Sequence, residues 1–356
     1  MALILGIETS CDDTSVAVLE GTRVLSLVTQ DQLGEHREFG GVVPEIASRR
    51  HIEAIAPVYL AAVQAAGVAA DDLEAVAVTR GPGLAGSLLV GLSFARGLAF
   101  GLEKPLVGVN HLEAHVYGCW LGLGESEFPE LPAVCLVASG GHTELTLMRS
   151  HGDHRLLGRT RDDAAGEAFD KVARALGLGF PGGPAIEKAA LGCADGVGPP
   201  YRLPRAWLEG TYDFSFSGLK TAVFRAVAGK LGPEEEVSIF GRGGPSSLQS
   251  GDAAALARMA AGFQNSIVEV LIAKTTRAAV EFDAASVLLA GGVAANSLLR
   301  SGLEAAIDRP LHMPEIRYCT DNGAMVAMAG EFALRRPELA GVVLDVEPAL
   351  RLAAGI

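Results

Sequence analysis

The feature of this sequence that most constrains its fold is a layout that occurs twice. Residues 3–19, LILGIETSCDDTSVAVL, and residues 131–148, LPAVCLVASGGHTELTLM, each run from an apolar strand through a short polar turn into a second apolar strand. Helical patterns follow both hairpins, at 44–67 after the first and at 165–178, 184–192 and 253–282 after the second. Alternating strands and helices indicate an α/β protein, and the recurrence of the layout indicates two related halves.

The length of the chain also favours two domains, because 356 residues exceed one typical hydrophobic core. A change of composition at 122–132 predicts a boundary between a first lobe, residues 1–125, and a second lobe, residues 131–321. We expect an insertion near 199–251, whose part 232–251 reads as exposed and flexible and receives no role. A final helix from about 322 to 340 is expected to return to the first lobe.

Composition restricts the partners and the compartment. A net charge of −13 argues against a broad basic groove, so nucleic-acid binding would need a local patch or a partner protein. The stretch RSHGDHRLLGRTRDD, residues 149–163, is either such a patch or an ordinary solvated face. The five cysteines are scattered, the N-terminus has no basic region, and no apolar run reaches membrane-spanning length without polar interruption. These features predict a soluble, cytoplasmic protein with no membrane partner.

The two polar turns are candidates for phosphate binding. In SGGHTE, residues 139–144, Gly140 and Gly141 would let the backbone approach an anion and offer N–H donors. In ETSCDDT, residues 8–14, Asp12 and Asp13 could hold a cation or position a nucleophile. Either turn alone is typical of any hairpin. Two turns at the start of two related halves favour a phosphate cleft between them.

Two further segments suggest a nucleotide. In LLAGGVAANSLLR, residues 288–300, a strand, a glycine turn and a helix follow one another, and Asn296 could hydrogen-bond the polar edges of a nucleotide. Around the PGGP corner, Asp170 and Glu187 could accept hydrogen bonds from ribose hydroxyl groups. Tight packing of the glycines and a surface salt bridge of Asp170 are the plain alternatives.

A metal site is suggested by NHLEAH, residues 110–115. His111 and His115 are four residues apart, so on a helix they share one face. Glu113 points about 200° away from His111, which weakens a zinc-peptidase reading. With Asp321 from CTDNGAM, the histidines would form a two-histidine, one-carboxylate set suited to iron(II) or zinc. Without a third ligand, the pair would be a polar stripe on a helix.

Read in order, GIETSCDDTSVAV, GPGLAGSLLVG, NHLEAH, ASGGHTEL, AGEAFDKVARALGL, PGGP, DFSFSGLKTAV, AGGVAANSLLR and CTDNGAMVAMAG resemble one family from Leu5 to about Gly330. It is the tRNA N6-adenosine threonylcarbamoyltransferase family in its bacterial form, once described as an O-sialoglycoprotein endopeptidase. The resemblance implies an actin, hexokinase and Hsp70-like (ASKHA) fold, with duplicated α/β lobes around a nucleotide cleft. It also implies metal ligands at His111, His115 and Asp321, and nucleotide contacts at Val137, Ala138, Ser139, Gly140, Gly141, Asp170, Gly183, Glu187 and Asn296.

The resemblance further implies an activity. The threonylcarbamoyl group of threonylcarbamoyl-adenylate would pass to N6 of the adenosine beside the anticodon of tRNAs that read codons beginning with A, and AMP would leave. Asp12 is the candidate for orienting or deprotonating the amine, and one divalent metal ion, Fe²⁺ before Zn²⁺, is the expected cofactor. Expected partners are tRNA, an inactive paralogous subunit and a small P-loop ATPase. A small-molecule kinase of the same superfold is the alternative.

Overall fold

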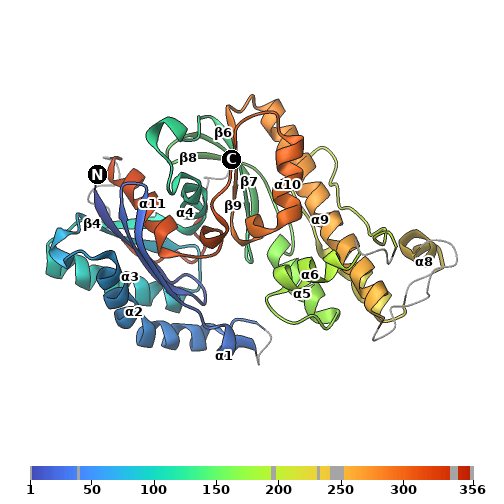
Figure 1. Ribbon diagram of the computed structural model, residues 1–356, viewed down its shortest axis with the longest axis horizontal. Coiled ribbons are helices and arrows are strands. Elements are labelled where there is room, and N and C mark those ends of the chain that lie inside the picture. The colour runs from blue at the N-terminus through green and yellow to red at the C-terminus, as the bar shows by residue number, and fades with distance from the viewer. Residues whose placement is uncertain are drawn as a thin grey trace.

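The computed structural model describes residues 2–37, 41–193, 198–230, 233–240, 252–336 and 344–352, and it contains two mixed five-stranded sheets (Figure 1). The strands of the first sheet, in spatial order, are β3 (Arg23–Gln30), β2 (Thr14–Glu20), β1 (Leu3–Glu8), β4 (Ala75–Gly81) and β5 (Leu106–Asn110). The strands of the second are β10 (Leu311–His312), β9 (Ser286–Ala290), β6 (Ala133–Ala138), β7 (Thr143–Ser150) and β8 (Asp153–Arg159).

The two sheets share one topology. In each, the first three strands along the chain form an antiparallel meander, and two later strands add in parallel beside the first one. Leu5 in β1 pairs with Val18 in β2 and with Val76 in β4, and Leu136 in β6 has the equivalent central position between β7 and β9. Both predicted hairpins and the predicted duplication are therefore confirmed.

The outer face of the first sheet carries two helices, α2 (Pro44–Ala66) and α3 (Ala85–Leu102), as Figure 1 shows. Side chains in β1 alternate between the faces, so Leu5 and Ile7 join the core under these helices while Ile4 points to the other side. The predicted helix at 44–67 is confirmed. It ends where Gly67 adopts a left-handed conformation, with φ of 69°.

The layer between the sheets consists mainly of α4 (His111–Tyr117) and α11 (Gly323–Leu334). α11 packs on β1, β2, β4 and β5, and α4 packs on α11 and also contacts β6 and β9. The core of this layer includes Tyr117, Trp120 and Phe332 together with inward-facing residues of both sheets. The helix that was expected at about 322–340 begins at Gly323, and residues 337–343 lie outside the described part of the chain.

The outer face of the second sheet is covered by a group of helices: α5 (Ala165–Ala175), α6 (Gly182–Leu191), α7 (Ser217–Val227), α9 (Ala253–Glu281) and α10 (Ser297–Ala306). α9 is 29 residues long, and Phe263, Ile267 and Leu271 are buried along it. The helices expected at 165–178, 184–192 and 253–282 are thus present. The first ends three residues early because Gly177 adopts a φ of 71°.

One expectation needs correction. Residues 233–240, expected to be irregular, form helix α8 (Pro233–Phe240), in which Ile239 is buried; residues 241–251 lie outside the described part. α3 is long and apolar enough to span a membrane by length and composition, although Arg96 interrupts its apolar run. Its Leu88 and Leu92 are fully buried, and Leu92 belongs to the core beneath the first sheet. The remaining short elements are α1 (Leu33–Arg37), η1 (Ala70–Asp72), η2 (Gly118–Trp120), η3 (Glu125–Glu127), η4 (Gly292–Ala295) and η5 (Ile316–Tyr318).

Candidate metal centre and nucleotide cleft

Two helix starts position the predicted metal ligands. β5 ends at Asn110, whose side-chain oxygen accepts hydrogen bonds from the N–H groups of Leu112 and Glu113 and so begins α4 at His111. His115 follows one turn later on the same face. Asp321 precedes Asn322, which caps α11 in the same manner by accepting from the Met325 N–H. The helix starts therefore fix His111 and Asp321, and the turn of α4 places His115 beside His111.

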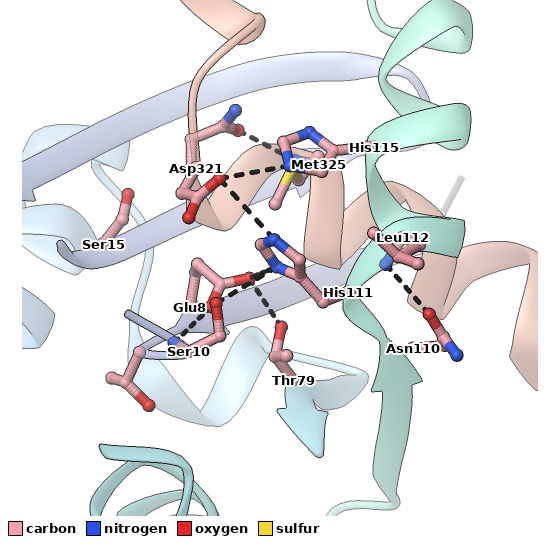
Figure 2. A network of polar contacts seen from close by, with 12 residues as sticks. Glu8, Ser10, Ser15, Thr79, Asn110, His111, Leu112, His115, Asp321 and Met325 are labelled. Atoms are coloured by element: carbon pink, nitrogen blue, oxygen red, sulfur yellow. Dashed lines mark hydrogen bonds and ion pairs between the residues drawn. The ribbon is translucent and has the colours of Figure 1, made fainter. Parts of the chain in front are cut away.

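The three ligands converge in the structure (Figure 2). Oδ1 of Asp321 lies 3.1 Å from Nε2 of His115 and 3.7 Å from Nε2 of His111. One potential ligand atom from each residue lies within 4.8 Å of the others, so the group could hold a metal ion. Nε2 of His115 is buried and, apart from its 3.1 Å contact with Asp321 Oδ1, has no polar partner among the described residues, so a metal ion would fit there.

A buried glutamate that the sequence analysis missed supports His111. Oε2 of Glu8 lies 3.0 Å from Nδ1 of His111 and accepts a hydrogen bond of 2.7 Å from the Thr79 hydroxyl, while Oε1 accepts one of 2.6 Å from the Ser10 N–H (Figure 2). An ionised carboxylate can only accept, so the proton of a neutral His111 lies on Nδ1. Nε2 is then free for a metal, as in carboxylate–histidine–metal arrangements.

The electrostatics of the group reflect mutual stabilisation of buried charges. Burial alone would raise the pKa values of Glu8 and Asp321, but the neighbouring histidines hold both below their usual range. Burial opposes the charge on His111, yet Asp321 and Glu8 raise its pKa to about 9. The nearby His142 responds in the other direction, because burial and the two ligand histidines lower its pKa to about 4. The site is arranged to hold positive charge.

A cleft of ≈ 730 Å³ opens directly beside the candidate ligands. Its lining includes His111 and Asp321, and it brings in both polar turns through Ser10, Cys11, Asp12, Ser139, Gly140 and Gly141. Asp170, Lys171 and Arg174 of α5 line it as well. The cleft therefore joins the metal ligands to the two hairpin turns that the sequence predicted as phosphate sites.

The glycine turn of the second sheet is open toward this cleft. Gly140 and Gly141 have no heavy atom within 4 Å of where a Cβ would stand, apart from their chain neighbours. Their turn is held by hydrogen bonds from the Ser139 N–H to the His142 carbonyl, at 2.8 Å, and from the Gly166 N–H to the Ser139 carbonyl, at 3.1 Å. The first residues of α5 thus support a turn whose glycines remain accessible to an anion.

In the first turn, the structure distinguishes the two aspartates. Asp12 lines the cleft. Burial and the charges of Asp321 and Asp12 raise the pKa of Asp13 to about 8. The turn is tied to α2 by His51, whose Nδ1 lies 2.7 Å from the Thr14 hydroxyl and whose Nε2 lies 3.0 Å from the Cys11 carbonyl. His51 is a support that the sequence analysis did not find.

The other predicted nucleotide residues lie around this cleft without lining it. Val137 and Ala138 are fully buried in β6. Gly183 lies in the first turn of α6, next to Gly182, whose N–H donates to Asp170 Oδ1 at 2.7 Å. The amide group of Asn296 caps α10 and donates to Gln264, and Glu187 accepts from the Ser297 N–H at 2.9 Å. These two polar side chains already have protein partners.

Sequence comparisons agree with this geometry. The profile of the tRNA N6-adenosine threonylcarbamoyltransferase family matches residues 23–328. A protein of that name from Thermomicrobium roseum is 54% identical over 366 residues, covering 98% of this chain and 97% of its own length. One from Symbiobacterium thermophilum is 51% identical over 357 residues, covering 99% of this chain and 98% of its own.

Structural comparisons bear on the fold. HypF from T. kodakarensis superposes with a TM-score of 0.57 at 13% identity, over 94% of this chain and 48% of that one. Component A of the (R)-2-hydroxyglutaryl-CoA dehydratase of Acidaminococcus fermentans superposes with a TM-score of 0.51 at 12% identity, over 94% of this chain and 100% of that one. The predicted actin-like and hexokinase-like fold is confirmed by these likenesses and by the duplicated sheets. By its profile match and its sequence relatives, the chain belongs to the tRNA N6-adenosine threonylcarbamoyltransferase family.

Proposed function

We propose that this protein transfers the threonylcarbamoyl group of threonylcarbamoyl-adenylate to N6 of the adenosine next to the anticodon, in tRNAs that read codons beginning with A. The observation that carries the proposal is the convergence of an open glycine turn, the His111, His115 and Asp321 group and the Asp12 turn on one cleft. Such a cleft can hold a nucleotide phosphate beside a charged acyl group. The family name supports the same substrate class.

In the reaction, the N6 amine attacks the carbamoyl carbon and a new N–C bond forms. The bond from that carbon to the phosphate oxygen breaks and AMP leaves, while a base takes the proton of the amine. The N–H groups of Gly140 and Gly141 would hold the phosphate, and Asp170 would accept from the ribose. Asp12, across the cleft, would orient the amine or take its proton. The protein thus mainly positions two reactants.

The residues present fit a divalent metal ion, since two neutral imidazole nitrogens and one carboxylate with open positions suit Fe²⁺, our first choice, or Zn²⁺. When bound, such an ion supplies Lewis-acid stabilisation of negative charge on substrate oxygens. His111 and His115 would hold it through Nε2, and Glu8 would keep His111 in the required tautomer. Asp321 completes the set from the opposite side.

Partners and compartment are part of the proposal. We place the protein in the cytoplasm, where its tRNA substrate would be found. The outer face of α2 and α3 exposes Ile52, Leu60, Leu89 and Phe100, of which Phe100 is 87% exposed. Exposed apolar side chains on these two helices suit the expected paralogous subunit. The small P-loop ATPase is expected from the family resemblance alone. The division into lobes at 1–125 and 131–321 stays a prediction from the change of composition at 122–132.

The proposal is tested by a transfer assay with purified protein, threonylcarbamoyl-adenylate, unmodified tRNA and the partner proteins, before and after chelation. We expect modified tRNA and AMP in equal amounts, and a loss of both after chelation. His111→Ala should lose bound metal and transfer together, whereas His312→Ala, a histidine on β10, should retain both. Full activity in metal-free His111→Ala protein would refute the proposal, as would ATP-dependent phosphorylation of a small molecule in place of transfer.

A further inference from the structure

The chain is acidic overall, yet one face beside the cleft gathers cations. We propose that this basic face, formed by Arg155, Arg159, Arg161 and Arg277, binds the phosphate backbone of the tRNA next to the target adenosine. The inference rests on the proposed function, because it names the surface by which that substrate docks. The first three residues lie on or just after β8, and Arg277 lies on α9.

Contacts among the described residues join these cations into one surface. Nε of Arg161 lies 2.8 Å from Asp213 Oδ2, and the Arg159 N–H donates to Asp213 Oδ1 at 3.0 Å. Lys274 donates to the Asp213 carbonyl from the other side. The segment around Asp213 therefore links the end of β8 to the middle of α9.

Aromatic rings are interleaved with the cations. The Arg277 guanidinium lies 4.1 Å from the ring centroid of Tyr212, and the Arg155 guanidinium lies 5.5 Å from that of Phe282. The two rings are 6.0 Å apart. Guanidinium groups beside aromatic rings are an arrangement suited to phosphates and to stacked bases.

Cations and carboxylates share this face. Asp213 pairs with Arg161, Glu281 accepts from the Tyr212 hydroxyl, and Glu144 is partly buried, which raises its pKa. Lys274 is buried beneath the face, and burial is the main cause that lowers its pKa to about 8. The guanidinium groups of Arg155 and Arg159 form no ion pair within the described ranges, so both charges are available to a ligand.

The location connects the basic face to the proposed chemistry. A cavity of ≈ 540 Å³ is lined by Arg159, Arg161 and Asp213 at one side and by Gly141 and His142 at the other. Gly141 and His142 also line the cleft that holds Asp12 and the metal ligands. A polyanion that places one base in the cleft would therefore carry its neighbouring phosphates across the basic face. A single-stranded RNA loop has this geometry, with bases that can be extruded from the stack.

The test compares the binding of unmodified tRNA to the wild-type chain and to Arg159→Gln and Arg155→Gln/Arg159→Gln variants between 50 and 200 mM salt, the range that reveals phosphate contacts. A plot of the logarithm of the association constant against the logarithm of the salt concentration should lose about 0.8 of its slope for each lost phosphate contact. At 0.1 M salt this change corresponds to roughly sixfold weaker binding. The KM for tRNA should rise similarly, with kcat unchanged. Arg49→Gln, an exposed arginine on α2, is the matched control and should bind like the wild type.

Arg159→Lys keeps the charge and should restore most of the binding, which a merely structural role of the arginine would not allow. Calorimetric binding of the adenylate should be equal in all variants and confirms that each is folded. Unchanged tRNA affinity and salt slope in the double variant, with wild-type transfer intact, would overturn the basic face and leave the proposed function standing. A wild-type chain that modifies no tRNA under any condition would instead refute the proposed function.

Discussion

The replacement Glu8→Gln tests the candidate metal centre most directly. Glu8 is fully buried and accepts from three donors, on His111, Thr79 and Ser10. A glutamine has the same shape but only one acceptor oxygen. If its NH₂ group replaces Oε1, it faces the Ser10 N–H; if it replaces Oε2, it faces His111 and Thr79. In either orientation at least one buried donor loses its acceptor, at a cost of about 1–3 kcal/mol.

The effect on metal affinity has two opposing parts. Loss of an outer carboxylate typically weakens a metal site about 10–100-fold, because the histidine is less basic and less well oriented. Glu8 also raises the pKa of His111, which Asp321 and Glu8 together bring to about 9 against the effect of burial. At pH 7 a metal must therefore displace a proton from wild-type His111, which reduces apparent affinity about 100-fold. Glu8→Gln relieves part of that competition.

The pH profile separates the two parts. Below pH 9, wild-type affinity should rise about tenfold per pH unit, since His111 must lose one proton to bind. In Glu8→Gln the pKa of His111 moves back toward its ordinary value, so the metal affinity of the variant should rise less steeply with pH above pH 7. The variant should consequently bind about 10–100-fold more weakly at pH 9 and less than that at pH 7.

The assay is competition between the protein and a chelator for Zn²⁺, followed from pH 6.5 to 9 on both proteins. Thr79→Val is the graded control, because it removes one donor to Glu8 and leaves the contact with His111 intact. Equal affinities of wild-type and Glu8→Gln protein at pH 9, with the variant folded, would refute the assignment of Glu8 as the support of His111.

Two further predictions concern stability. His154 is buried, and burial is the main cause that lowers its pKa to about 4. Between pH 4 and 6.5 the unfolded state therefore binds more protons than the folded state. The folded state consequently loses stability as the pH falls through that window. Between pH 7.5 and 4.5, the free energy of unfolding of His154→Phe should fall by about 2–3 kcal/mol less than that of the wild type, as measured by denaturant titration. Equal losses in the two proteins would contradict the reasoning. A Cβ on Gly6 would lie 2.1 Å from the Gly323 carbonyl oxygen at the start of α11, so Gly6→Ala should cost about 3 kcal/mol or more. Gly97→Ala, in open space on α3, should be neutral or stabilising by up to about 1 kcal/mol, and comparable losses in both variants would refute the packing explanation.

Much of the fold was predictable because local patterns determine it. The apolar strands around both polar turns, and helix ends such as Gly67, are encoded by neighbouring residues. Helix α8 was missed because PEEEVSIF lies between glycine-rich segments that resemble an irregular loop. α3 is apolar enough on average to span a membrane, although Ser87, Ser93 and Arg96 interrupt its apolar run as the sequence analysis expected.

The candidate site was less predictable, since it depends on side-chain partners. Asn296 and Glu187 were expected to face a nucleotide, but each bonds to protein groups at the start of α10, because a helix N-terminus offers free N–H donors to any nearby acceptor. Their role as nucleotide contacts stays a prediction. Glu8 was overlooked since a carboxylate at the end of an apolar strand gives no periodic signal. Only the pairing of β1 with β4 brings it to Thr79.

The position of the metal group follows from the duplicated fold. His111 and His115 lie on α4, which the chain forms when it leaves the first sheet at β5, and Asp321 precedes α11, which the chain forms when it leaves the second sheet after β10. Both helices pack in the layer between the sheets. A metal held by all three would therefore connect segments that arrive from the two halves of the protein, at the edge of the cleft between their polar turns. Because α4 carries both histidines and the start of α11 fixes Asp321, the spacing of the ligands depends on how the two sheets pack against α4 and α11. Changes in that packing, such as Gly6→Ala beneath α11, should consequently alter metal affinity as well as stability.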